Sequence, residues 1–200
     1  MESGDSAALG CVIMAAGNAS RFGRNKLESE LDGRTLITRA LDAVPAEMFR
    51  RVTVVSQYPA ILRMAEARGF DAVLNDRPED GVSRTIRLGT ERMAECAAIL
   101  YMVADQPLLQ KDTVRRVARA WLDDPGCIAA ASSGGRRGNP CIFPARLFPE
   151  LLALTGDRGG SAVIRAHPEL LRLVETEARE LVDCDTPEAL RELAQGSPRG

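Results

Sequence analysis

Short apolar runs rich in β-branched residues alternate along the chain with longer segments of helical periodicity, and this alternation restricts the fold more than any other feature. Strands are predicted at Cys11–Met14, Val52–Ser56, Ala72–Leu74, Ile99–Val103 and Ile128–Ala131. Helices are predicted at Thr35–Ala43, Ala60–Arg68, Ser83–Glu95 and Asp112–Leu122. This order predicts an α/β fold, in which helices cover both faces of a mostly parallel sheet.

The pattern changes after residue 131. Residues 132–138, with the sequence SSGGRRG, predict a flexible and turn-rich segment. The later elements are predicted as a strand at Pro140–Phe143, a helix at Ala145–Leu154, a strand at Glu180–Cys184 and a helix from Pro187. Thr186 is a typical cap for the last helix, which then has proline at its first position. No repeat or linker interrupts the chain, so we expect one domain over residues 1–200.

The composition excludes several classes of protein. The formal net charge of −2 leaves no basic surface excess for nucleic acid, and it fits a small anionic ligand better than a polymer. No apolar run approaches the roughly 20 residues that span a bilayer, and the first residues lack the pattern of a secretory signal. We therefore expect a soluble cytoplasmic protein that binds neither nucleic acid nor membrane.

Cysteine and histidine usage narrows the chemistry further. The 5 cysteines are odd in number and form no C-x-x-C pair, which argues against a disulfide framework or a structural zinc site. Cys11 and Cys127 are expected in the core. His167 is the only histidine and precedes Pro168, a position typical of a helix end. A lone histidine argues against a His-rich metal site and against a Ser-His-Asp arrangement.

The loop after the first strand carries small residues and separated cations. Gly17 and its neighbours allow backbone N–H groups to approach phosphate oxygens, while Arg21 and Lys26 can neutralise phosphate charge. The loop is not a G-x-x-x-x-G-K-[ST] phosphate loop, because no Ser or Thr follows Lys26. A solvated surface loop is the alternative. Only Lys26 and Lys111 are lysines in an arginine-rich chain, which favours a phosphate-binding role for Lys26.

Two acidic residues follow predicted strands. Asp105 comes directly after Ile99–Val103, and Asp185 comes after Glu180–Cys184. Ligands of α/β sheets bind beyond the carboxyl ends of the strands, where such carboxylates can hold Mg²⁺ against phosphate oxygens. The alternative is structural: Asp105 then caps the following turn, and Asp185 caps the last helix.

Taken together, these segments resemble a known family. Ala15-Ala16-Gly17-x-x-Ser20-Arg21-x-Gly23-x-x-Lys26 resembles the A-A-G-x-x-x-R-x-G-x-x-K signature of nucleotidyltransferases with a Rossmann-like three-layer α/β/α fold. Four more pieces follow in order: Asn75 with Gly81-x-x-x-Thr85, Ala104-Asp105-Gln106-Pro107, Gly138-Asn139-Pro140-x-x-Phe143, and Gly156-Asp157-x-Gly159 ahead of Asp185-Thr186-Pro187-Glu188. Over residues 10–192 the chain is most similar to the molybdenum cofactor cytidylyltransferases, a group of MobA-like NTP transferases.

The resemblance implies a role for each matching residue. The catalytic residues would be Arg21, Lys26 and Asp105, and the metal ligands would be Asp105 and Asp185. The expected ligand-binding residues are Ala15, Ala16, Gly17, Ser20, Arg21 and Lys26 around the nucleotide, Asn75 and Thr85 near its base or ribose, and Gly138, Asn139, Pro140 and Asp157 around the acceptor. Residues 10–131 would then bind the nucleotide, and residues 132–194 would bind the acceptor and complete the fold.

The implied reaction is transfer of CMP from CTP to the terminal phosphate of molybdopterin, with release of pyrophosphate. Mg²⁺ is the expected cofactor, and Mn²⁺ can take its place. A molybdenum hydroxylase that receives the product is a further candidate partner. The family often has Met and several Ser between Gly81 and Thr85, and this chain has Val82-Ser83-Arg84 instead; likewise Phe22 replaces a common Met.

Three alternatives stay open at this point. The same chemistry could use GTP, or it could use another phosphorylated acceptor. The chain could also be a carrier that holds the cofactor without catalysing anything. Arg136 and Arg137 lie beside the predicted acceptor strand, so residues 132–138 are expected to be either a mobile loop that orders over the acceptor phosphate or a solvated basic turn.

Overall fold

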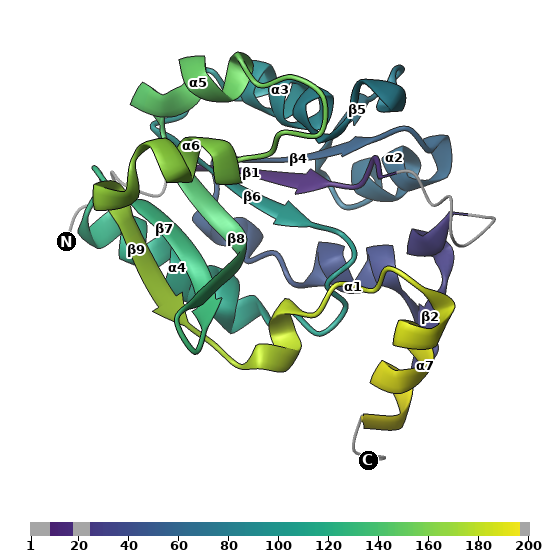
Figure 1. Ribbon diagram of the computed structural model, residues 1–200. Helices are drawn as coiled ribbons and strands as arrows, with labels where there is room; N and C mark the ends of the chain where they lie inside the picture. Colours follow the sequence, from purple (N-terminus) through teal and green to yellow (C-terminus); the bar gives the residue numbers. More distant parts are fainter. Residues whose placement is uncertain (1–8, 18–24, 197–200) are drawn as a thin grey trace.

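The computed structural model describes residues 9–17 and 25–196 of the chain. Seven strands form one sheet in the order β5-β4-β1-β6-β8-β7-β9 (Figure 1). The bounds are β1 Leu9–Met14, β4 Arg51–Ser56, β5 Asp71–Leu74, β6 Ala98–Val103, β7 Ile128–Ser133, β8 Arg136–Pro144 and β9 Leu171–Glu175. Strand β8 runs antiparallel to β6 and β7, and the other neighbours pair in parallel. The predicted α/β fold with a mostly parallel sheet is confirmed.

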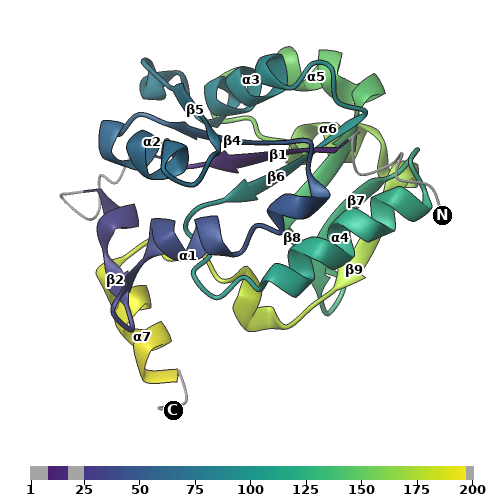
Figure 2. The same cartoon turned by 180° about the vertical axis from the view of Figure 1, so that it is seen from behind.

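Helices cover both faces of the sheet. Their bounds are α1 Leu36–Asp42, α2 Pro59–Glu66, α3 Val82–Arg92, α4 Lys111–Asp123, α5 Phe148–Leu152, α6 Ser161–Ala166 and α7 Pro187–Gly196. Residues of α1, α2 and α4 pack into the core on one face, and residues of α3, α5 and α6 pack on the other. Figure 2 shows α1 and α4 on the opposite side of the sheet from α3 and α5.

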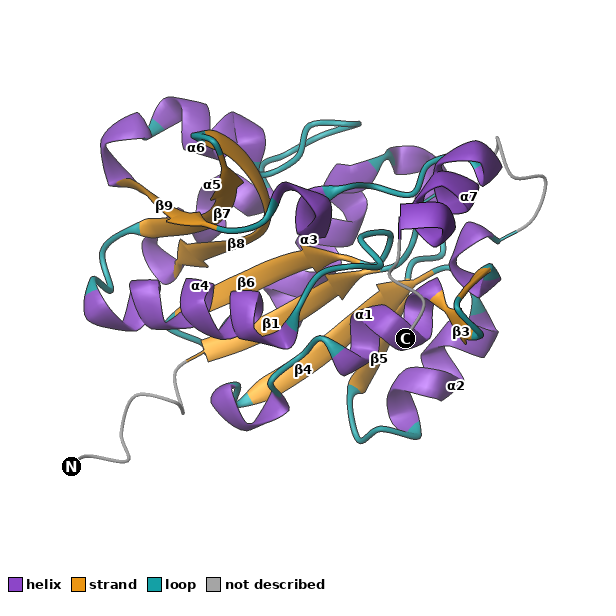
Figure 3. Cartoon of the chain, turned by 90° about the horizontal axis from the view of Figure 1, so that it is seen from below, coloured by secondary structure: helices purple, strands orange, loops and turns teal. Residues whose placement is uncertain are grey.

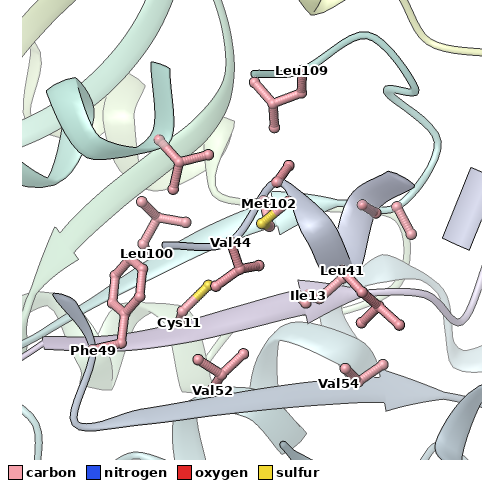
Figure 4. Packing of buried hydrophobic residues seen from close by; sticks show 14 of the residues in the cluster. Cys11, Ile13, Leu41, Val44, Phe49, Val52, Val54, Leu100, Met102 and Leu109 are labelled. Atoms are coloured by element: carbon pink, nitrogen blue, oxygen red, sulfur yellow. The ribbon is translucent and has the colours of Figure 1, made fainter. Parts of the chain in front are cut away.

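The alternation of side chains along β1 explains why both faces are apolar. Cys11 and Ile13 point into the core that α1 and α4 cover, whereas Val12 between them belongs to the core under α3. Figure 4 shows Cys11 and Ile13 among Val52, Val54 and other buried residues. All 5 cysteines are free and buried, as predicted for Cys11 and Cys127.

A small hairpin and the last helix lie beside the main sheet. Strands β2 (Glu30–Leu31) and β3 (Arg34–Thr35) are joined by Asp32 and Gly33, which both have positive φ angles of 52° and 73°. Two such residues form the tight turn that suits the twist of a two-stranded hairpin. Helix α7 contacts β2, and Figure 3 shows it near the hairpin. Among the described residues, no helix is both long and apolar enough to cross a membrane.

Three sequence predictions in the second half differ from the structure, one of them, the helix at Ala145–Leu154, only in part. Residues 132–138 are not a flexible loop: Ser133 pairs with Arg136 across a two-residue turn, in which Gly134 and Gly135 adopt φ angles of 55° and 76°. Because both glycines tolerate the left-handed conformation, the strands continue to the turn itself. The predicted helix at Ala145–Leu154 is divided into a 3₁₀ turn, Ala145–Leu147, and the short helix α5.

The third wrong prediction is the strand at Glu180–Cys184. The sheet edge is taken by β9, which pairs in parallel with β7. Residues Ala178–Leu181 form a 3₁₀ turn instead, because the buried Glu180 carboxylate accepts hydrogen bonds from the Gln110 backbone N–H at 2.9 Å and the Thr176 hydroxyl at 2.9 Å. The chain then passes in irregular conformation to α7.

Candidate functional site

The site lies at the carboxyl ends of β1 and β6, which are neighbours in the sheet. Met14 at the end of β1 pairs with Val103 at the end of β6. The loop after β1 is fixed by the adjacent strand β4, since the Ser56 hydroxyl donates to the Ala15 carbonyl at 2.8 Å. The Gln57 amide donates to the Ala16 carbonyl at 2.9 Å. Because these carbonyls are bonded toward β4, the loop is held at the ligand edge of the sheet.

Lys26 joins the two predicted metal ligands. Its ammonium lies 2.6 Å from Asp105 Oδ2 and 2.9 Å from Asp185 Oδ1, although Asp185 is 159 residues away in sequence. The Lys26 side chain is 13% exposed, and those of Asp105 and Asp185 are 21% and 58% exposed. Partial burial by itself lowers the pKa of Lys26. The charge of Asp105 and the hydrogen bonds to both carboxylates outweigh it and raise the pKa above its ordinary value, so the ammonium stays charged.

Asp185 can contact Lys26 because Thr186, and not Asp185, caps the last helix. The Thr186 hydroxyl accepts from the Ala189 backbone N–H at 3.1 Å, as an N-cap residue does. The Cys184 backbone N–H donates to the Asp105 carbonyl at 2.8 Å and brings the segment beside the β6 loop. Asp185 therefore joins the carboxylate cluster instead of capping the helix.

A pocket of about 300 Å³ lies over this cluster. The residues that line it include Ala15, Ala16, Gly17, Lys26, Thr85, Asp105 and Asp157. Asn75 is buried behind the wall and donates to the Thr85 hydroxyl at 3.2 Å, so it supports Thr85 from below. The structure therefore brings together, around one pocket, most of the residues predicted to surround the nucleotide.

Gly81 explains how Asp157 reaches the same pocket. Gly81 has a φ angle of 82°, and a Cβ there would lie 2.4 Å from the Gly156 carbonyl carbon and 2.6 Å from Asp157 Oδ1. Only glycine permits this close approach of the two loops. Asp157 was expected to border the acceptor, but it lines the smaller pocket beside the residues predicted for the nucleotide.

A larger pocket of about 660 Å³ adjoins the first, and Met14, Val82 and Val103 line both. Gly138 and Asn139, which the resemblance assigns to the acceptor, line it, whereas Pro140 is a buried residue of the same strand, β8. Arg136 and Arg137 also line it, and Arg137 donates to the Ser161 hydroxyl at 2.9 Å. Apolar side chains such as Ile86 and Phe143 form another part of the wall. The pocket thus offers cationic groups and an apolar surface to one ligand.

Sequence reasoning assigned no role to two residues at this junction. Gln106 and Asp183 both line the larger pocket, and the Gln106 amide donates to Asp183 Oδ1 at 2.9 Å. Asp183 lies two residues before Asp185, and residues at this spacing share one face of an extended segment. This spacing was the sequence signal that could have pointed to Asp183. Ser20 and Arg21 were predicted for the site and lie outside the described residues.

The two pockets together offer charged groups that can stabilise a charged ligand. Among the described residues, they hold no activated nucleophile. Cys141 lines the larger pocket, but burial raises the pKa of its thiol to about 11, so the thiol is neutral near pH 7. Burial likewise raises the pKa of Tyr101. The arrangement suits a reaction in which the attacking group comes with its own negative charge and the protein supplies cations.

The carboxylates fit a divalent cation. Asp105 and Asp185 present two hard oxygen donors around one positive centre, the donor type that Mg²⁺ and Mn²⁺ prefer. Within the described part of the chain, no group of three His, Cys, Asp or Glu residues could hold a metal ion. A third protein ligand is not required, because Mg²⁺ is usually bound through one or two carboxylates together with substrate phosphates.

The sequence is similar to a known family and to a known relative. Residues 11–171 match the family model described as the MobA-like NTP transferase domain. The purine catabolism protein PucB of Bacillus subtilis (strain 168) is 28% identical over 193 residues, which cover 88% of this chain and 91% of PucB.

Solved structures share the fold. Rv0371c from Mycobacterium tuberculosis H37Rv is similar with a TM-score of 0.82 and 23% identity, over 94% of this chain and 99% of that one. Its complex with manganese has a TM-score of 0.79 and 21% identity, over 95% and 100% of the two chains.

Two more distant structures also share it, each at 14% identity. CMP:2-keto-3-deoxy-manno-octonic acid synthetase complexed with CTP has a TM-score of 0.73, over 94% of this chain and 97% of that one. Molybdopterin-guanine dinucleotide biosynthesis protein A from Archaeoglobus fulgidus has a TM-score of 0.70, over 93% and 97%. At these identities the structures speak for the fold, and the family model covers most of the chain. The chain belongs to the MobA-like NTP transferase domain family and is a nucleotidyltransferase.

Proposed function

We propose that this nucleotidyltransferase transfers CMP from CTP to the terminal phosphate of molybdopterin, giving molybdopterin cytosine dinucleotide and pyrophosphate. The observation that carries the proposal is the position of Lys26 between Asp105 and Asp185, in the wall of the smaller of two adjoining pockets. A cation beside two carboxylates serves a reaction between two phosphorylated substrates, because it offsets their mutual repulsion.

The smaller pocket is assigned to the nucleotide. The backbone of Ala15, Ala16 and Gly17 lies along it, and Lys26 and Asp105 form the wall at the phosphate end. Thr85 and Asp157 also line this pocket and would contact the base or ribose. Ser20 and Arg21 are assigned to the triphosphate on the signature alone.

The larger pocket is assigned to the acceptor. Its apolar wall suits a planar heterocycle, and Arg136 and Arg137 suit an anionic substituent. Because Met14, Val82 and Val103 line both pockets, the two ligands would lie side by side. This adjacency allows an oxygen of the acceptor phosphate to approach the α-phosphorus of the nucleotide.

In the reaction, an oxygen of the acceptor phosphate forms a bond to the α-phosphorus, and the bond from that phosphorus to the bridging oxygen of pyrophosphate breaks. The acceptor phosphate is already anionic, so no protein base is needed. Lys26 binds phosphate oxygens and stabilises the charge that moves to the leaving pyrophosphate. Asp105 and Asp185 would hold Mg²⁺ or Mn²⁺, which neutralises phosphate charge when bound.

The choice of CTP is supported by the family resemblance and by the occurrence of a CTP complex on this fold. The archaeal neighbour is named for a molybdopterin-guanine dinucleotide, which supports a molybdopterin acceptor and makes GTP the rival nucleotide. Delivery of the product to a molybdenum hydroxylase belongs to the same proposal.

The experiment combines purified protein, Mg²⁺, CTP and molybdopterin, and follows pyrophosphate together with the mass of the pterin product. The proposal expects pyrophosphate and a pterin heavier by one CMP, both only when Mg²⁺, CTP and molybdopterin are all present with the protein. Binding of molybdopterin without pyrophosphate release would contradict it and would identify a carrier. Pyrophosphate release only with a different phosphorylated acceptor would reassign the substrate.

A further inference from the structure

Asp185 is delivered to the site by a segment that the sheet does not hold. Residues 182–186 follow the 3₁₀ turn Ala178–Leu181 and precede α7, and none of them is in a strand. Before this segment, the buried Glu180 fixes the turn; after it, α7 contacts β2. The position of the second carboxylate therefore depends on local contacts between the segment and the β6 loop.

The side chain of Gln106, in the β6 loop, contacts this segment directly. Its amide nitrogen donates to the Leu181 carbonyl at 3.3 Å and to Asp183 Oδ1 at 2.9 Å, so that one group spans the start and middle of the segment. The neighbouring Asp105 carbonyl accepts from the Cys184 backbone N–H at 2.8 Å. Two successive residues of the β6 loop thus hold the segment on both sides of Asp183.

The groups that make these contacts are buried, which protects the hydrogen bonds from water. Gln106 is 3% exposed and Cys184 is fully buried, so water does not replace the bonds easily. Both partners of the Gln106 nitrogen are acceptors, which fixes the orientation of the amide. Gly138 completes the fit, since a Cβ at that position would lie 3.0 Å from a methyl carbon of Leu181.

We propose that Gln106 is a positioning residue that docks residues 181–185 against the β6 loop and thereby places Asp185 beside Lys26. Gln106 acts through Asp185 and does not itself bind the metal or the phosphates. The inference rests on the proposed function for its link to the metal, since Asp185 is a metal ligand only within that proposal. Loss of a group that orients a metal ligand typically weakens metal binding by about 10- to 100-fold.

The test uses Gln106→Met, which keeps the length and volume of the side chain and removes its N–H donors. Gln110→Ala is the matched control, because Gln110 is exposed and its side chain donates to the Leu108 carbonyl within its own loop. The first measurement is hydrogen exchange of the Cys184 amide. We expect protection in the wild type and in the control, and faster exchange in Gln106→Met. Unchanged protection in Gln106→Met would overturn the inference.

The second measurement is the affinity for Mn²⁺ alone, followed by the paramagnetic resonance of the free ion. Gln106→Met and Asp185→Ala should each weaken binding by about tenfold or more, and the double variant should be no weaker than Asp185→Ala. Additive losses would show that Gln106 acts independently of Asp185. If Asp185→Ala binds Mn²⁺ like the wild type, the metal assignment of the proposed function is wrong, while the exchange result still decides whether Gln106 docks the segment.

Discussion

The Lys26 ammonium lies 2.6 Å from the Asp105 carboxylate, across 79 residues of sequence. One residue follows β1 and the other follows β6, so the parallel pairing of these strands brings them together. The same ammonium also binds Asp185 from the far end of the chain. A single lysine therefore balances two carboxylates before any substrate arrives.

Asp105→Ala separates catalysis from folding. We expect pyrophosphate release to fall about 100-fold or more, because the principal carboxylate of the metal site is lost. The melting temperature should fall by only about 2–4 °C, since the ion pair is partly exposed and Lys26 keeps Asp185. Pyrophosphate assays and thermal melts check both. Asp112→Ala, at an exposed residue paired with Arg116, is the control, and normal turnover by Asp105→Ala would refute the metal assignment.

Lys26→Met tests the phosphate role of the lysine. The chain has a second lysine, Lys111, which is exposed at the start of α4, so Lys111→Met is a matched control. We expect kcat to fall about 100- to 1000-fold in Lys26→Met, as on removal of one preorganised charge-stabilising group, and to stay unchanged in Lys111→Met. Steady-state kinetics give the answer. Equal activity of the two variants would exclude Lys26 from the reaction.

The larger pocket is tested through Arg137. Arg137→Ala should raise the KM for the phosphorylated acceptor by about tenfold or more, because a hydrogen bond to a charged group is worth about 1.5–3 kcal/mol. The KM for the nucleotide should not change, since Arg137 lines only the larger of the two pockets. Arg165→Ala, at an exposed residue of α6 outside both pockets, serves as the control. A rise in the nucleotide KM instead would reverse the assignment of the pockets.

Gly81→Ala tests the close contact between the loop that contains Gly81 and the loop that contains Gly156. The substituted Cβ would lie 2.4 Å from the Gly156 backbone in a residue with a φ angle of 82°. We expect a loss of about 2–4 kcal/mol in the free energy of unfolding, from left-handed strain and steric overlap together. Gly33→Ala has a similar φ angle of 73° and nothing within 4 Å of its Cβ, so it should lose only about 1–2 kcal/mol. Urea unfolding compares them, and equal losses would show that the close approach to Gly156 is not important.

Much of the fold follows from local sequence patterns. The apolar runs that became β1, β4 and β6 are continuous because both faces of these strands are buried, and their spacing by helical segments fixes parallel pairing. The strands in the second half of the chain were harder to predict. β9 carries Leu171, Leu173 and Val174 beside two charged residues, and residues 180–184 have the same proportion of apolar and charged residues. Residues 180–184 nevertheless form no strand, because Glu180 is bonded into a turn.

The position of Asp105 was predictable because it follows a strand of the parallel sheet, and the carboxyl ends of such strands meet at one edge. Lys26 and Asp185 were grouped with it by the signature resemblance, since the strand predicted before Asp185 does not form. The place of Asp157 in the smaller pocket could not be predicted, because it depends on the contact with Gly81, which is distant in sequence. Gln106 was quoted in a motif without a role, since its partners, Leu181 and Asp183, are 75 and 77 residues away.

The most direct test of the central claim is pyrophosphate release by the purified protein with Mg²⁺ and molybdopterin, measured in parallel with CTP, GTP, ATP and UTP. We predict release with CTP that exceeds the other three nucleotides by at least tenfold in kcat/KM. A preference for GTP would keep the fold and the charge arrangement around Lys26 and Asp105 but would contradict transfer of CMP. No release with any of the four nucleotides would contradict molybdopterin as the acceptor.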